Sequence, residues 1–247
     1  MSRVLDYIDR KREDIAQLPF LLFVQDRSID PRQRLGFAPC LAPLAMGFSD
    51  FMALGLRDAS SKDELQQVLN KHTQVDDRHW EFFVHDLKAL GFTEQGINLS
   101  EAVLFLWGAH CVKTRQLTYA LMGMTRKASP IMRLVILQSI EVISDTGFRL
   151  FREVGTEFTQ KTGQMLMYFG QHHQDVEDEH EEMGAISIRS MISSYPWTPA
   201  EEAQALALAD ETSACYMAAA EDLVAYALKA IEQGPWWPLT HLRSSAR

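Results

Sequence analysis

Residues 130–161 read PIMRLVILQSIEVISDTGFRLFREVGTEFTQK, and this stretch decides the fold class. Its apolar residues recur every three or four positions, which is the period of an α-helix. Ser129 and Pro130 stand at the expected start, and Gly163 follows the expected end, where a left-handed residue can close the last turn. We therefore predict one long helix here.

Apolar residues recur at helical spacing in other segments on both sides of this stretch. Further helices are predicted at roughly 2–17, 32–55, 61–90, 99–126, 165–183 and 199–233. Ser61-x-x-Glu64 and Thr198-x-x-Glu201 have the pattern of capping boxes at two of the starts. No convincing alternation of apolar and polar residues marks a strand, and no linker divides the chain. We predict an all-α fold of about seven helices in a single domain, 1–247.

Composition excludes several classes of protein. The formal net charge is -9, and no Lys/Arg cluster offers a nucleic-acid surface. Three cysteines, Cys40, Cys111 and Cys215, lie far apart without a CxxC, which argues against a disulfide framework and a thiolate zinc site. No apolar run reaches the roughly 18 residues of a membrane helix, and the charged start does not resemble a secretory signal. We expect a cytoplasmic protein that binds neither nucleic acid nor membrane, with a homodimer as the default assembly.

Two segments share one arrangement of histidines and acids. HTQVDDRH spans 72–79 and HQDVEDEH spans 173–180, so each reads H-x3-[DE]-x2-H. Positions i, i+4 and i+7 fall within an arc of about 60° on a continuous helix. Both sets also interrupt the apolar stripe of their predicted helix. We therefore expect six side chains to point inward: His72, Asp76, His79, His173, Glu177 and His180.

Glu141 adds a carboxylate from the long helix, on the same stripe as Leu134, Leu137 and Phe148. A buried carboxylate needs a proton, an ion pair or a metal ion. Imidazole and carboxylate without thiolate suit iron, manganese or zinc, and so large a set exceeds what one ion usually takes. We predict a site for two metal ions with Glu141 as the bridging carboxylate; Asp76 alternatively belongs to a surface ion-pair network.

The set His79, Glu141 and His173-x3-Glu177-x2-His180 resembles the ligand pattern of the haem-oxygenase-like diiron oxidases and oxygenases, over most of residues 30–185. That family typically has a glutamate seven residues before its first histidine, where this chain has His72. Either His72 replaces the glutamate or Asp76 supplies the carboxylate. Glu177 stands where the family usually has aspartate.

The resemblance implies a haem-oxygenase-like bundle, two iron ions, and oxidation of a small organic substrate by dioxygen. Amino acids, amines and carboxylic acids are the usual substrates. One alternative is a metal-free, thiaminase-like protein that binds or transforms a small molecule through acids and histidines. Another is a ferritin-like dinuclear metal protein with Asp50 as an extra acid. Glycine-rich nucleotide motifs are missing, and a haem on one histidine would not explain the repeated spacing, so we expect neither cofactor.

Overall fold

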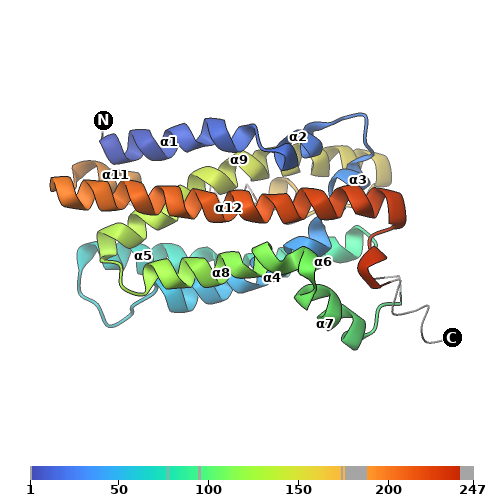
Figure 1. The fold of residues 1–247 in the computed structure, drawn as a ribbon, viewed down its shortest axis with the longest axis horizontal. Coiled ribbons are helices and arrows are strands. Elements are labelled where there is room, and N and C mark those ends of the chain that lie inside the picture. Colours follow the sequence, from blue (N-terminus) through green and yellow to red (C-terminus); the bar gives the residue numbers. More distant parts are fainter. Residues whose placement is uncertain (1, 77, 94–95, 174, 176–187, 240–247) are drawn as a thin grey trace.

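The computed structural model describes residues 2–76, 78–93, 96–173, 175 and 188–239, and every regular element within these ranges is a helix (Figure 1). The all-α prediction is therefore confirmed. In chain order the α-helices are α1 (Arg3–Ala16), α2 (Pro19–Gln25), α3 (Pro31–Arg34), α4 (Ala38–Asp50), α5 (Glu64–Asp76), α6 (His79–Ala89), α7 (Leu99–Trp107), α8 (Val112–Thr125), α9 (Pro130–Thr162), α11 (Ile188–Ser194) and α12 (Pro199–Gln233).

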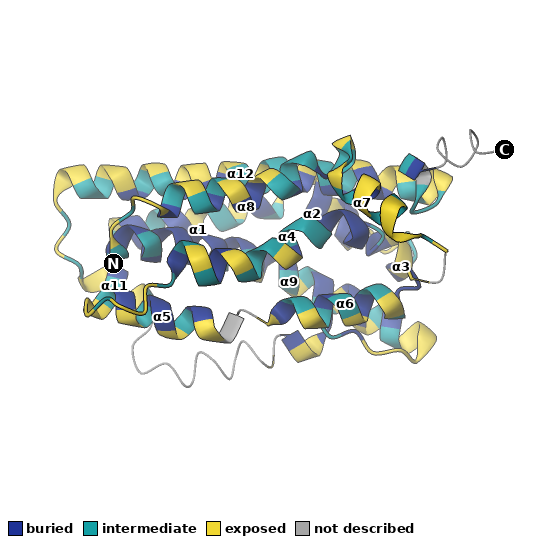
Figure 2. Cartoon of the chain, turned by 90° about the horizontal axis from the view of Figure 1, so that it is seen from below, coloured by how far each residue is buried: buried dark blue, intermediate teal, exposed yellow. Residues whose placement is uncertain are grey.

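The two longest helices organise the bundle. Helix α9 has 33 residues and α12 has 35, and they pack against each other along the long axis of the molecule (Figure 1). Helix α1 covers both, while α4 packs on α6 and α8, and α5 lies against α9. The buried residues face the space between these helices, and the exposed residues form the outer surface (Figure 2). The hydrophobic effect over this buried face is the main force that holds the bundle together.

Two of the predicted helices are each divided in two. The helix at 61–90 is two helices, because α5 ends at Asp76 and α6 begins at His79. Arg78 precedes α6 in a non-helical conformation, and Glu81 places a negative charge in the first turn, where the helix dipole favours it. The region 99–126 is likewise divided at Gly108, whose extended backbone ends α7. Arg115 stabilises this break by donating hydrogen bonds to the carbonyls of Leu106 and Gly108.

The helix starts also test the capping predictions. Thr198 and Glu201 form the predicted capping box of α12. The box predicted for Ser61 and Glu64 is wrong, because α5 begins at Glu64 and Asp63 caps it by accepting a hydrogen bond from the Gln66 amide at 3.1 Å.

The segment Ala38–Leu56 combines α4 with a π-helical extension at Phe51–Leu56. It is long and apolar enough to cross a membrane by length and composition alone, with a mean hydropathy of 1.3. Within the described chain it packs against α6 and α8. The prediction that no apolar run reaches the length of a membrane helix is wrong for this segment, of which 44% is buried inside the structure.

Candidate functional site

Two of the predicted site residues meet between α5 and α9. The Nε2 atom of His72 lies 3.2 Å from the Oε1 atom of Glu141, within hydrogen-bonding distance. Their side chains are 25% and 36% exposed, so water reaches this pair. The contact exists because α5 packs along α9. An imidazole and a carboxylate so placed can exchange a proton or bind one cation together.

A second pair is more deeply buried. His79 is the first residue of α6 and is 8% exposed, whereas His173 is 5% exposed. Their ring centroids are 4.7 Å apart in an edge-to-face arrangement. The predictions that these two histidines point inward are confirmed, although the two helices expected to carry them have different limits in the structure.

Helix α9 connects the two pairs. Phe148 lies two turns after Glu141, so both residues are on the same face of the helix. The ring of Phe148 contacts His173 with centroids 4.2 Å apart. Seven residues of helix correspond to a rise of about 10 Å. The His72–Glu141 pair and the His79–His173 pair therefore occupy successive positions along one face of α9.

The neighbours of His173 determine which ring nitrogen carries its proton. Its Nδ1 atom lies 3.1 Å from the carbonyl oxygen of Tyr168, which can only accept a hydrogen bond. Nδ1 must therefore be the protonated nitrogen, and in the neutral ring the lone pair is on Nε2. A backbone carbonyl on Nδ1 orients many histidines that bind metals through Nε2.

The helix predicted at 165–183 begins later than expected. Residues 164–170 are non-helical, and helical backbone starts at 171. Leu166 and Phe169 are buried as predicted, but from an irregular segment rather than from a helical stripe. His173 thus reaches the core because this segment is fixed against α6 and α9. We call residues 164–170 the approach segment.

Asp86 fixes the approach segment to α6. This aspartate is 0% exposed, and its carboxylate accepts hydrogen bonds from the backbone amides of Met167 at 2.7 Å and Phe169 at 2.9 Å. Its Oδ1 atom also lies 3.0 Å from Nδ1 of His85. The carboxylate replaces the hydrogen bonds that these amides would make in a helix. Asp86 was not predicted to have a role, although it interrupts the apolar stripe of Phe83, Leu87 and Leu90.

Gly155 brings the same segment close to α9. A methyl group on this glycine would overlap the carbonyl oxygen of Phe169. Only glycine leaves room for this approach, because any other residue would push the segment away. Asp86 and Gly155 together hold His173 beside His79 and Phe148.

Helix α12 contributes a tyrosine to the Glu141 side of the site. Burial raises the pKa of the Tyr216 phenol far above its usual range, and the negative charge of Glu141 raises it further. The phenol therefore keeps its proton at neutral pH and remains a hydrogen-bond donor. No sequence pattern pointed to Tyr216, because its position relative to Glu141 depends on α12 packing beside α9.

The structure does not describe the side chains of the other three predicted ligands. Glu177 and His180 belong to 176–187, and Asp76 ends α5 without a described side chain. Among the side chains that are described, no three His, Cys, Asp or Glu residues converge in a geometry that could hold a metal ion. Four predicted residues, His72, His79, Glu141 and His173, are thus brought together as two pairs.

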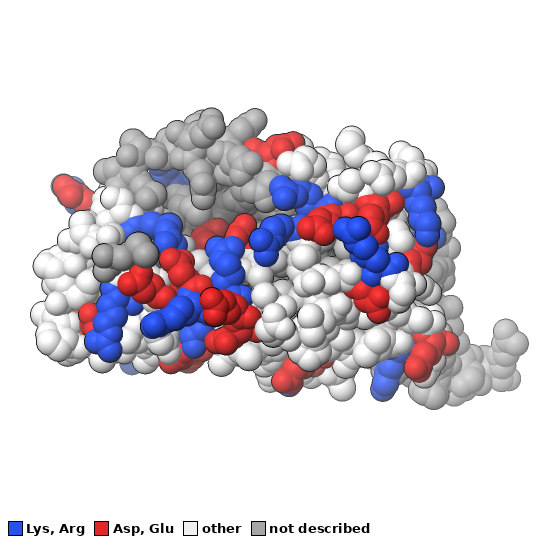
Figure 3. All heavy atoms as spheres, turned by 90° about the horizontal axis from the view of Figure 1, so that it is seen from above, with Lys and Arg blue, Asp and Glu red and all other residues white. Residues whose placement is uncertain are grey.

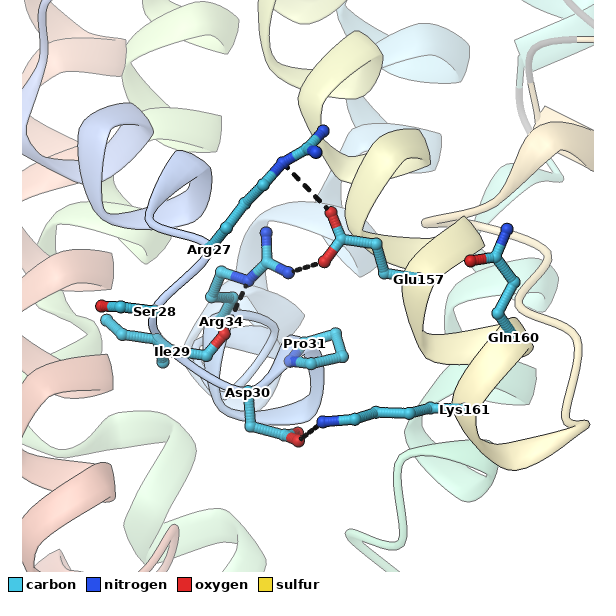
Figure 4. A pocket seen from close by; sticks show the side chains of 9 residues that line it. All are labelled: Arg27, Ser28, Ile29, Asp30, Pro31, Arg34, Glu157, Gln160 and Lys161. Atoms are coloured by element: carbon cyan, nitrogen blue, oxygen red, sulfur yellow. Dashed lines mark hydrogen bonds and ion pairs between the residues drawn. The ribbon is translucent and has the colours of Figure 1, made fainter.

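A polar pocket lies elsewhere, at the C-terminal end of α9 (Figure 4). Its cations are matched by acids: Arg34 pairs with Glu157, and Lys161 pairs with Asp30 at 2.6 Å. Glu157 is sixteen residues after Glu141 along α9, a rise of about 24 Å. None of the predicted ligands lines this pocket, so we do not place the chemistry there.

Other charged residues have structural partners. Asp145 forms an ion pair with Arg12 of α1. On the face seen in Figure 3, positive and negative side chains are interspersed.

No protein-family model and no curated protein sequence matches this chain.

Proposed function

We propose that this protein is a non-haem diiron oxidase or oxygenase with a haem-oxygenase-like helical bundle. The observation that supports the proposal most is the gathering of four imidazole and carboxylate side chains along one face of α9, with His72 beside Glu141 and His79 beside His173. These side chains come from α5, α6, α9 and the chain that follows the approach segment. Asp76, Glu177 and His180 complete the proposed ligand set.

The donor set suits iron. It consists of imidazoles and carboxylates without a thiolate, which is typical of non-haem iron sites. The hydrogen bond from Nδ1 of His173 to the Tyr168 carbonyl leaves Nε2 as the ligating nitrogen. Manganese and zinc bind the same donors. We therefore propose iron as the metal together with oxidation by dioxygen as the reaction. When bound, two ferrous ions would supply the electrons that reduce dioxygen.

The protein's own residues prepare the site for this chemistry. Phe82, Phe148 and Tyr168 surround the two buried histidines and exclude water from them. Tyr216, on the neighbouring helix α12, keeps its phenolic proton at neutral pH, so it adds no negative charge beside Glu141. A small amine, amino acid or carboxylic acid is the substrate class that we propose.

Metal analysis after anaerobic loading with ferrous iron tests the proposal. We expect about two irons per chain, as in other helical bundles with dinuclear carboxylate sites. His173→Ala should lower this number, because it removes a buried ligand. His172→Ala is the matched control: it changes the adjacent, exposed residue, whose ring contacts Phe82 and none of the proposed ligands, and it should leave the iron content unchanged. Iron binding that is equal in both variants would contradict the proposal.

A second candidate function is favoured by the direct contact between His72 and Glu141. An imidazole and a carboxylate 3.2 Å apart can act as a general acid–base pair without a metal. A thiaminase-like protein that transforms a small molecule would use them in this way. The absence of bound iron under every loading condition would favour this candidate. The ferritin-like alternative is weakened, since Asp50 is exposed.

A further inference from the structure

Two cysteines far apart in the sequence meet in the core, outside the proposed metal site. Cys40 lies in the first turn of α4, and Cys111 immediately precedes α8. Both are 0% exposed and present as free thiols, and their Sγ atoms are 3.6 Å apart. The Cys40 thiol also lies 3.0 Å from the carbonyl oxygen of His110. A disulfide needs an S–S distance of about 2.0 Å, so the two sulfurs must move closer by about 1.6 Å.

The surroundings make the two thiols unequal. Cys111 precedes α8, a 14-residue helix whose N-terminal dipole favours a thiolate, and it shares this N-terminus with the Asp222 carboxylate, which accepts a hydrogen bond from the Lys113 amide. The hydrogen bond with Cys40, together with His110 and Arg115, lowers the pKa of Cys111 to about 6 in spite of its burial. The pKa of Cys40 is raised, chiefly by its hydrogen bond to Cys111 and by burial. Cys111 is thus the more acidic thiol and Cys40 its protonated neighbour.

We propose that Cys40 and Cys111 are an oxidisable dithiol, in which Cys111 attacks a peroxide and Cys40 then closes an intramolecular disulfide. This pair is a modification site independent of the metal centre. Hydrogen peroxide is small and uncharged, so local opening of the bundle is sufficient for its entry.

The reaction balances in two steps. The Cys111 thiolate attacks one oxygen of hydrogen peroxide, the O–O bond breaks, and the released hydroxide takes a proton to become water. Cys111 is then a sulfenic acid. The Cys40 sulfur attacks the Cys111 sulfur, the S–O bond breaks, and a second water leaves as its proton is transferred. Two thiols have lost two electrons, and peroxide has been reduced to two waters.

Cys215 provides an internal control. It is partly exposed, whereas Cys40 and Cys111 are buried, and burial together with Glu211 raises its pKa. If exposure decided reactivity, peroxide would oxidise Cys215 first. If the paired geometry decides it, the Cys40–Cys111 disulfide forms before Cys215 reacts.

The test treats the folded, full-length protein with hydrogen peroxide and maps its peptides by mass spectrometry. We expect a Cys40–Cys111 cross-link lighter by two hydrogen atoms, with Cys215 still a thiol. Oxidation of Cys215 alone, with the other two cysteines still reduced until the protein is unfolded, would overturn the proposal. This measurement needs no variant and does not depend on whether a substitution folds.

Two variants test the order of attack. With Cys40→Ser, the sulfenic acid on Cys111 has no partner, so dimedone should label Cys111. With Cys111→Ser, labelling of Cys40 should fall by at least about tenfold, since Cys40 is the less acidic thiol. Equal labelling in the two variants, or labelling of Cys40 alone, would refute the role assigned to Cys111. Circular dichroism identifies variants that are folded.

Discussion

Asp86 provides a direct test of how the structure positions His173. We consider Asp86→Asn, which keeps the size of the side chain but replaces one carboxylate oxygen by an NH2 group. The carboxylate accepts hydrogen bonds from the amides of Met167 and Phe169. The asparagine oxygen can serve only one of them, while its NH2 group faces the other donor.

The expected effect follows from these two hydrogen bonds. A hydrogen bond to a charged group contributes about 1.5–3 kcal/mol, and a buried donor left without an acceptor has a similar cost. We expect Asp86→Asn to lower the free energy of local opening by about 2–3 kcal/mol, which corresponds to roughly 30- to 150-fold faster amide exchange. Native-state hydrogen exchange at Met167 and Phe169 measures this change.

Asp145→Asn is the matched control. Its carboxylate is 51% exposed and pairs with Arg12 at the surface, so the substitution should cost less than about 1 kcal/mol. It should not alter exchange at the approach segment. Unchanged protection of Met167 and Phe169 in Asp86→Asn, or equal effects of the two substitutions, would show that Asp86 does not hold this segment.

Three further predictions concern other parts of the structure. Gly155→Ala should push Phe169 away from α9 and lower iron affinity with little change in helix content, as measured by metal titration and circular dichroism. Arg189 holds the pKa of Asp9 below its usual value. The stability that this ion pair adds should therefore be present above about pH 4 and be lost as the pH falls through the lowered pKa. Asp9→Asn should flatten the acid limb of a pH-dependent denaturation curve. Thr198→Ala should lower the free energy of unfolding by about 1 kcal/mol through loss of the α12 cap, and an unchanged denaturant midpoint would contradict this.

The long helices could be predicted because their signals are local. Helix α12 begins with the Thr198 capping box and has no internal break, and α9 begins after Ser129 and ends at Gly163 in the left-handed conformation. Hydrophobic periodicity over more than eight turns leaves no other structure for either stretch.

The breaks in the other helices could not be predicted from local signals. Residues 164–170 leave the helical conformation because Asp86 and Gly155, both distant in sequence, provide acceptors and space for them. Periodicity describes a helix face but not the partner that this face meets.

The candidate site was predictable as a set of residue types rather than as a geometry. The burial of His79 and His173 was predicted, but His173 is buried because Asp86 and Gly155 position the segment before it, not because a continuous helical stripe carries it. Their edge-to-face contact, and the pairing of His72 with Glu141, depend on how α5, α6 and α9 pack. The meeting of Cys40 with Cys111 across 71 residues had no sequence signal at all.

The proposed function depends on acids and imidazoles from separate helices holding two irons along one face of α9. Crystallography of protein reconstituted with ferrous iron, using anomalous scattering at the iron edge, tests it most directly. We predict two anomalous peaks whose nearest protein atoms include Nε2 of His173 and a carboxylate oxygen of Glu141. A fully reconstituted crystal without iron peaks near these two residues, or with His79 and His173 turned away from the metal, would contradict the account.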